Sequence, residues 1–191
     1  MGQAGGVGVD GGLDRLSASG LLSPAGDGGD VKTVSDFLPL LGKPAREAEG
    51  HLIEEVARSW SVTLPEDFIA IAGAYGDLSI SEFIFVCGAR ELRAYAAGMG
   101  PLMEECSDVP HPVLPSAGGA LLWGNTIEGD QLFLVRGKDG TWTVSAFLRQ
   151  WGEWYESDME FSDWLYLALK GEVAAEWLPE WEPLPHPVEL V

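Results

Sequence analysis

Apolar residues recur at helical spacing in four stretches of this chain. In the first stretch Leu52 and Val56 mark one face, and Pro44 suits the first turn of a helix. Thr63 and Glu66 have the spacing of a capping box, which predicts the start of a second helix. Glycine and proline at positions 98, 100 and 101 predict that the third helix breaks or ends early. The predicted helices cover residues 44–60, 64–75, 90–103 and 161–170, with a short helical turn at 35–41.

Strand-forming residues gather between the second and third helices and again after the third. The unbroken apolar run 83–87 predicts one central strand, within 78–87, that is covered on both faces. Three further strands, at 120–124, 130–136 and 141–147, are separated by turns rich in Gly and Asp, which predicts a hairpin meander. This order of elements predicts an α+β fold with a mostly antiparallel sheet of about four to six strands and helices packed around it.

The two ends of the chain differ in composition from its middle. Residues 6–11 match the G-x-G-x-x-G spacing, but no strand precedes them, so residues 1–31 are predicted to be a disordered Gly-rich tail. Residues 32–172 are predicted to form a single domain, and residues 173–191 an acidic extension that contains Pro and Trp. This extension either solubilises the protein or docks as an extended strap on the domain or on another protein.

Charge and composition exclude several classes of protein. With 11 Lys and Arg against 30 Asp and Glu, the formal net charge of −19 argues against binding to nucleic acid or to anionic membranes. Eight Trp and seven Phe exclude a chain that is disordered throughout. No secretory signal or membrane-spanning run is found, so we expect a cytoplasmic protein whose Cys87 and Cys106 are reduced thiols.

The sequence contains no recognisable catalytic or metal-binding constellation. His51, His111 and His186 lie far apart in the sequence, and neither H-x-x-x-H nor C-x-x-C spacing occurs. No P-loop or G-x-S-x-G motif is present, and the many paired carboxylates follow from the acidity of the whole chain. We therefore predict no catalytic residue, no cofactor and no metal ligand, and a protein that is not an enzyme.

Acidic residues and tryptophans concentrate toward the C-terminus. Between Glu153 and Glu189 there are ten acidic residues and a single basic one, Lys170. Tryptophans ringed by carboxylates suit a basic protein partner, because the rings anchor an interface and the charge accelerates encounter. Trp151 and Trp154 share a side if their segment is helical and are separated if it is extended. The predicted partner-binding residues are Glu128, Asp130, Trp151, Glu153, Trp154, Glu156, Asp158 and Glu160.

Two stretches of the chain resemble motifs of the SUKH superfamily, the Smi/Knr-type domains. The first is Leu64-Pro65-Glu66-Asp67-Phe68 with Tyr75-Gly76-Asp77 after it. The second is Gly129-Asp130-Gln131-Leu132-Phe133-Leu134, followed by Trp142-Thr143-Val144 and by Phe161-Ser162-Asp163-Trp164-Leu165. The resemblance covers roughly residues 45–172. The Asn-Gly that the family usually has after the second helix is replaced here by Ala74-Tyr75-Gly76.

The resemblance implies a SUKH-like fold and a mostly non-catalytic role. Bacterial members of this family are regarded as immunity proteins that bind and neutralise a cognate toxin, often a nuclease or deaminase. We therefore expect a module that occludes the cationic groove of a basic toxin in a stoichiometric complex. The alternatives are a regulatory scaffold of the same family without a toxin partner, and a hydrolase with an unrecognised acidic metal site.

Overall fold

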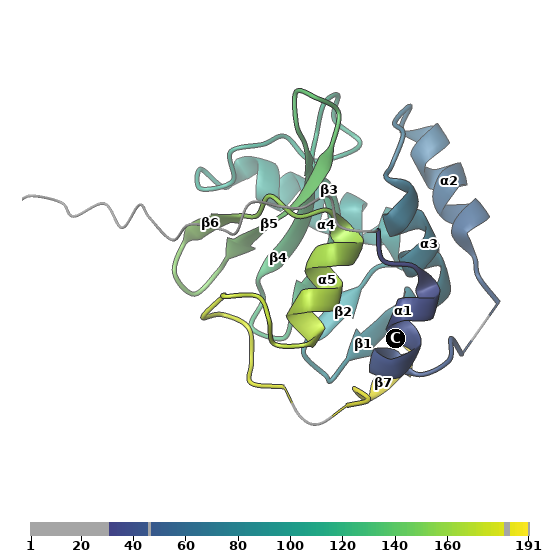
Figure 1. The fold of residues 1–191 in the computed structure, drawn as a ribbon. Helices are drawn as coiled ribbons and strands as arrows, with labels where there is room; N and C mark the ends of the chain where they lie inside the picture. Colours follow the sequence, from purple (N-terminus) through teal and green to yellow (C-terminus); the bar gives the residue numbers. More distant parts are fainter. Residues whose placement is uncertain (1–30, 46, 182–183, 191) are drawn as a thin grey trace, which may run out of the picture.

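The computed structural model describes residues 31–45, 47–181 and 184–190, which form a seven-stranded antiparallel sheet with five helices (Figure 1). The strands lie side by side in the order β6-β5-β4-β3-β2-β1-β7. This arrangement confirms the predicted α+β class, with one strand more than expected. The predicted tail 1–31 lies outside the described residues except for Val31. The elements are α1 (Val34–Leu41), α2 (Gly50–Ser59), α3 (Glu66–Tyr75), β1 (Leu78–Ile80), β2 (Ile84–Val86), α4 (Glu91–Glu105), β3 (Leu121–Thr126), β4 (Gln131–Arg136), β5 (Trp142–Leu148), β6 (Glu153–Glu156), α5 (Phe161–Leu169) and β7 (Val188–Leu190).

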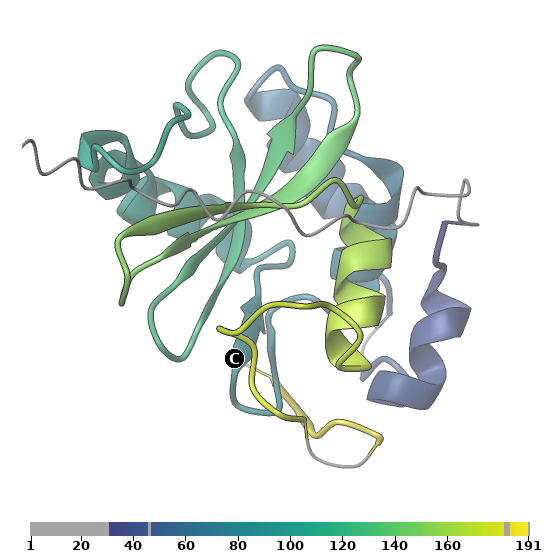
Figure 2. The ribbon, with the colours of Figure 1, turned by 60° about the vertical axis from the view of Figure 1, so that its left-hand side comes forward.

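The sheet separates two hydrophobic cores of unequal size. Side chains alternate between the two faces of a strand, so Leu132 and Leu134 of β4 enter the larger core while Phe133 enters the smaller one. Helices α1, α2, α3 and α5 supply the larger core, and α4 with the loop after it supplies the smaller one. Figure 1 shows α5 in front of the sheet and α4, drawn fainter, behind it, and Figure 2 shows the same layers from the side. The central strands are therefore covered on both faces.

The predicted meander of three strands is confirmed. Strands β4 and β5 pair along six residues, from Gln131 opposite Phe147 to Arg136 opposite Trp142. The turn that joins them ends at Gly140, whose φ of 93° favours glycine. Strand β3 also approaches β2 closely, because a Cβ added to Gly124 would lie only 2.2 Å from the carbonyl oxygen of Phe85.

The central strand predicted from the run 83–87 is confirmed as β2, but the prediction of only one strand within 78–87 is wrong. The structure has two short antiparallel strands there, β1 and β2, in which Leu78 pairs with Val86 and Ile80 with Ile84. They are joined by a tight turn in which Ser81 and Glu82 have φ angles of 50° and 54°. The turn contains neither Gly nor Asn, which usually occupy positions of positive φ, so the sequence gives no turn signal between the two strands.

The helix predicted to start near Pro44 begins only at Gly50. There the backbone of α2 crosses α3 so closely that a Cβ on Gly73 would lie 2.7 Å from the nitrogen of Gly50. The backbone N–H of Glu49 donates to the carbonyl of Gly73 at 2.8 Å, which fixes the crossing. The first turn expected from the sequence is therefore replaced by a contact between two glycines.

The early end predicted for the third helix is also wrong. Helix α4 continues through Gly98, Gly100 and Pro101 to Glu105. Its buried residues lie at helical spacing, so tertiary packing outweighs the low helix propensity of these three residues. A small residue also suits the position of Gly100, where an added Cβ would lie 3.7 Å from the Val113 side chain.

The capping box predicted at Thr63 and Glu66 is absent from the structure. The N-cap of α3 is Pro65, and no side chain caps it. A capping box instead starts α1, where the Asp36 carboxylate accepts hydrogen bonds from the backbone N–H and the hydroxyl of Thr33, both at 2.8 Å. Spacing alone does not distinguish the two sites, because it does not show which residue starts the helix.

The described part of the C-terminal segment packs against the domain. Strand β7 pairs antiparallel with β1 and forms that edge of the sheet. The His186 ring is 2 % exposed, and its Nε2 donates to the carbonyl of Leu169 in α5 at 2.7 Å while its Nδ1 accepts from the Ser81 hydroxyl at 3.2 Å. The His186 backbone N–H donates to Leu40 of α1 at 2.7 Å. This histidine therefore ties the segment to three separate elements.

Candidate functional site

The structure distributes the eight predicted partner-binding residues over three neighbouring places. Three of them line a cavity of about 400 Å³: Glu128, Asp130 and Trp151. Three lie on the edge strand β6: Glu153, Trp154 and Glu156. The last two lie in the connection from β6 to α5: Asp158 and Glu160.

The cavity lies where four separate segments of the chain meet, and we name it the corner cavity. The β3–β4 turn contributes Glu128, the β5–β6 turn contributes Trp151, and the C-terminal segment contributes Glu176 and Trp177. Apolar lining comes from Phe83, Leu148, Leu178 and Pro179. Its lining combines carboxylates with aromatic rings, which makes it suited to a cationic group.

Asp130 lines the corner cavity, but its carboxylate holds the β3–β4 turn together. One oxygen accepts the backbone N–H of Arg149 at 3.0 Å, and the other accepts the hydroxyl of Thr126 at 2.7 Å. The residue is only 4 % exposed. Gly129 before it has a φ of 88°, which completes the tight turn. Asp130 therefore positions Glu128 and the neighbouring β5–β6 turn.

Trp151 and Trp154 point to different places, because Trp151 lies in the β5–β6 turn and Trp154 lies beyond it on strand β6. Trp151 is 46 % exposed in the turn before β6 and lines the corner cavity. Trp154 is half-buried in β6, with its ring 5.1 Å from Phe133 and 5.6 Å from His111. Its indole N–H donates to the Glu156 carboxylate at 3.2 Å. Of the two rings, Trp151 is the one more available to a partner.

Strand β6 is one of the two edges of the sheet. It pairs with β5 alone, from Ser145 opposite Glu156 to Leu148 opposite Glu153. Glu153 and Glu156 are both exposed at its two ends. An edge strand presents unpaired backbone groups, and charges on it discourage pairing with unrelated strands. We name the corner cavity together with β6 the acidic face.

The two acids after β6 lie at the start of α5. Burial, and next the negative charges of Asp67 and Asp163, raise the pKa of Glu160 above its ordinary value of 4.5. Asp158 is exposed in the same connection. The carboxylate of Asp67 accepts the backbone N–H of Ser162 at 2.8 Å and so caps the first turn of α5.

The family-like motifs of the sequence contact one another in the larger core. Besides the cap that Asp67 provides, the rings of Phe68 and Phe161 meet edge to face with their centroids 5.0 Å apart. Trp123 of β3 packs against Phe161 in the same way, at 5.0 Å. These four residues are buried and join α3, α5 and the sheet, so they stabilise the fold.

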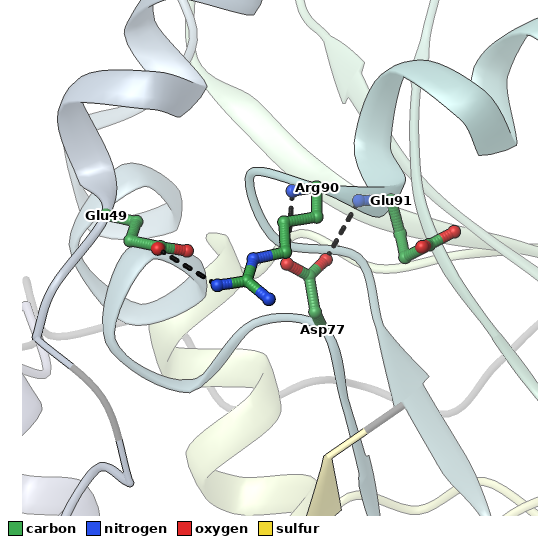
Figure 3. A network of polar contacts seen from close by, with 4 residues as sticks. All are labelled: Glu49, Asp77, Arg90 and Glu91. Atoms are coloured by element: carbon green, nitrogen blue, oxygen red, sulfur yellow. Dashed lines mark hydrogen bonds and ion pairs between the residues drawn. The ribbon is translucent and has the colours of Figure 1, made fainter.

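Asp77 has a comparable structural role at the start of α4. Its φ is 54°, and its carboxylate accepts the backbone N–H groups of Gly88, Arg90 and Glu91 at 2.8, 3.1 and 3.0 Å. Figure 3 shows this cap beside the ion pair between the Arg90 guanidinium and Glu49, which is 3.5 Å long. Sequence reasoning recognised the turn at Gly76 but missed the cap, because the capped amides follow only after β1 and β2.

Sequence reasoning also missed Glu176, Trp177 and Phe83 as lining residues of the corner cavity. A repeat of the pattern Glu-Trp-x-Pro at 176–179 and 180–183 was the available signal for the first two. Trp177 stacks on Trp164 with a centroid distance of 5.9 Å, and this contact holds its segment against α5. No local pattern connects that segment with the β3–β4 turn.

The thiols and histidines lie in separate environments. Burial, and next the charges of Asp77 and Glu91, raise the pKa of the Cys87 thiol to about 12. Both cysteines are free, and Cys106 is half-buried. Within residues 31–45, 47–181 and 184–190, no group of three or more His, Cys, Asp and Glu side chains is arranged to hold a metal ion. In that same part of the chain, no helix has the length and apolar character needed to cross a membrane.

Comparisons of the chain with protein-family models, with curated proteins and with solved structures returned no match.

Proposed function

We propose that this protein is a non-catalytic binding module of the SUKH type that neutralises a basic toxin, of the nuclease or deaminase class, by occlusion in the cytoplasm. The observation that supports the proposal most strongly is the acidic face. It joins exposed carboxylates and an exposed tryptophan over the corner cavity and the adjoining edge strand, and among the described residues none that lines the cavity is basic. A cationic substrate groove is the complementary surface.

The roles of the buried acids agree with this proposal. Asp67, Asp77 and Asp130 each accept backbone N–H groups, so their carboxylates position helices and a turn. The carboxylates that remain exposed on the acidic face have no such role in the fold. Their negative charge is therefore available to attract a partner and to occupy a site built for phosphate.

The test is an affinity purification of the tagged full chain from lysate of its native host at low and at moderate salt. We expect one basic protein to be retained in a one-to-one ratio and to weaken as salt rises. The double variant Glu153→Lys with Glu156→Lys reverses the charge of β6 and should retain far less of it. The control Glu54→Lys with Glu55→Lys makes the same change of charge at exposed positions of α2. Figure 1 shows α2 on the opposite side of the molecule from β6, so this control should retain the normal amount of the basic protein.

Two outcomes would contradict the proposal. If a trace of the protein silences a large excess of the captured toxin, its action is catalytic and occlusion is wrong. If several signalling or cell-wall proteins are retained with equal efficiency by both double variants, the protein is a scaffold and the acidic face is not its binding surface.

A further inference from the structure

We propose that the corner cavity receives the guanidinium group of an arginine side chain carried by the protein partner. This inference rests on the proposed binding function and specifies the chemistry that one part of the acidic face recognises. Four residues carry it: Glu128, Trp151, Glu176 and Trp177.

The first step concerns charge. The three ion pairs found within the described residues involve neither Glu128 nor Glu176, although both line the cavity. Arg149 lies outside the lining, with its Nη1 2.9 Å from where a Cβ on Gly129 would stand. None of the described lining residues therefore supplies a counter-charge to these two carboxylates, which a bound cation would supply.

The second step concerns the aromatic walls. The Trp177 ring is held in place by Trp164, at a centroid distance of 5.9 Å and an interplanar angle of 17°, and by Tyr155 at 5.6 Å. Trp151 stands 46 % exposed in the β5–β6 turn, where a ligand can cover it. Tryptophan is the most favourable aromatic residue for a cation over its ring. A fixed ring and an accessible ring thus line the same cavity as the two carboxylates.

The third step selects guanidinium among cations. This group is planar, weakly hydrated and able to stack on an indole while donating paired hydrogen bonds to a carboxylate, whereas an ammonium ion is compact and strongly hydrated. The volume of about 400 Å³ is at the lower end of the range of roughly 300 to 1000 Å³ for ligand sites, and it suits a single long side chain. Lining by both carboxylates and indoles therefore favours arginine over lysine.

The fourth step places this arginine on a protein. The β5–β6 turn that lines the cavity continues directly into β6, where Glu153 and Glu156 extend the negative surface along the sheet edge. A partner whose arginine enters the cavity therefore meets further carboxylates beside it. The net charge of −19 attracts such a basic surface before contact.

The experiment is an NMR titration of the ¹⁵N-labelled full chain at physiological salt, observed at the tryptophan indole N–H resonances. The probes are blocked Gly-Arg-Gly, blocked Gly-Lys-Gly and blocked Gly-citrulline-Gly, where citrulline has the shape of arginine without its charge. We expect the arginine peptide to shift the Trp151 and Trp177 resonances with a Kd near the millimolar range, about −4 kcal/mol. Binding of the lysine peptide should be weaker, and citrulline should leave both resonances unchanged.

Matched variants test the location of the site. The double variant Glu128→Gln with Glu176→Gln should weaken arginine binding about tenfold, and Trp151→Ala about threefold. Because all three residues lie at least partly exposed, these proteins should fold normally, as an unchanged Trp164 indole resonance would verify. Glu54→Gln with Glu55→Gln removes the same charge from α2 and should leave the affinity within about twofold of the parent, in line with the screening of distant charges.

Three results would overturn the inference: equal shifts with citrulline, shifts confined to other tryptophans, or equal weakening by both double variants. Two further outcomes distinguish a failure of the proposed function from a failure of this inference. If the arginine peptide binds as expected but no basic protein is retained from the host lysate, the toxin-binding function is wrong and the guanidinium site stands. If a basic protein is retained equally well by the Glu128→Gln and Glu176→Gln variant while the arginine peptide fails to bind, only the present inference is wrong.

Discussion

The two edges of the sheet end in opposite ways. At one edge β7 pairs with β1, and the buried His186 joins the C-terminal segment to α1, α5 and the β1–β2 turn. At the other edge β6 pairs only with β5 and carries exposed Glu153 and Glu156. Both edge strands pair with a single neighbour. We call the β7 edge the closed edge, because the hydrogen bonds of buried His186 anchor the segment that leads into it, and the β6 edge the open edge, because exposed charges protect it.

This difference separates stability from binding within one sheet. His186 at the closed edge is buried and hydrogen-bonded, so removing its ring leaves the buried groups that it contacts without partners, which is unfavourable. Polar groups at the open edge face water, so changing them alters the electrostatic field and leaves the packing intact. Substitutions at the closed edge should therefore change the free energy of unfolding, and substitutions at the open edge should change association.

The largest effect is expected beside the closed edge, at Asp77 just before β1. Asp77→Ala removes the acceptor of three backbone N–H groups, one of them buried, and should lower the free energy of unfolding by about 3 kcal/mol. Urea unfolding followed by tryptophan fluorescence measures it. The control Asp77→Asn keeps an oxygen acceptor and tolerates the φ of 54°, so it should lose clearly less. Equal stability of Asp77→Ala and the parent would show that the cap contributes nothing.

The second effect concerns the histidine that holds the C-terminal segment. His186→Ala removes the donor to Leu169 and the acceptor for Ser81, as well as the ring contact with Trp181 at 5.0 Å. We expect a loss of about 2 kcal/mol in the same unfolding experiment, and faster proteolysis within residues 173–181. His186→Gln retains a donor and should recover part of the loss. A variant cleaved no faster than the parent would contradict the closure of this edge by His186.

The third prediction sets the open edge against the closed one. Glu153→Lys with Glu156→Lys should change the free energy of unfolding by less than about 0.5 kcal/mol, because both side chains are exposed. The same double variant should bind the basic partner with a markedly lower association rate, measured by surface plasmon resonance. A loss of stability comparable to that of His186→Ala would mean that β6 also depends on its charged side chains for its structure.

The smallest effect is expected at Glu160, between β6 and α5. Its pKa is raised in the folded protein, so above its ordinary value of 4.5 the folded state carries a charge that burial and the neighbouring acids disfavour. Glu160→Gln removes that charge and should raise the melting temperature slightly at pH 7. At about pH 3 both forms are neutral, so the difference should vanish. Thermal melts of the parent and of Glu160→Gln across this pH range measure the difference in melting temperature. A lower melting temperature for Glu160→Gln than for the parent at pH 7 would contradict the prediction.

Much of the fold could be predicted where a pattern is local. The three strands of the meander and helix α5 follow from alternation, turn residues and helical spacing over short windows. The reversal within 78–87 was missed, because Ser81 and Glu82 form the turn at positive φ without the Gly, Asn or Pro that usually marks a turn in a sequence. The early end predicted for α4 at Gly98 and Pro101 was wrong, because tertiary packing of the helix outweighs the low helix propensity of these residues.

The candidate site was predictable only in part. Charge and tryptophan content indicated the region that contains Trp151, Glu153 and Glu156, and these three are exposed in the structure. The same reasoning could not separate Asp130, whose carboxylate is committed to the β3–β4 turn, from Glu128 beside it. It also could not place Glu176 in the same cavity as Glu128, because forty-odd intervening residues fold between them.

The sequence by itself determined the α+β class, the order of most elements and the acidity of the C-terminal third, because these depend on composition and short-range periodicity. The tertiary structure alone decided which acids hold the fold together and which remain exposed. Asp67 reaches Ser162 and His186 reaches Ser81 only once distant segments meet. Whether a polar side chain is satisfied internally depends on these long-range contacts, and so does its availability to a partner.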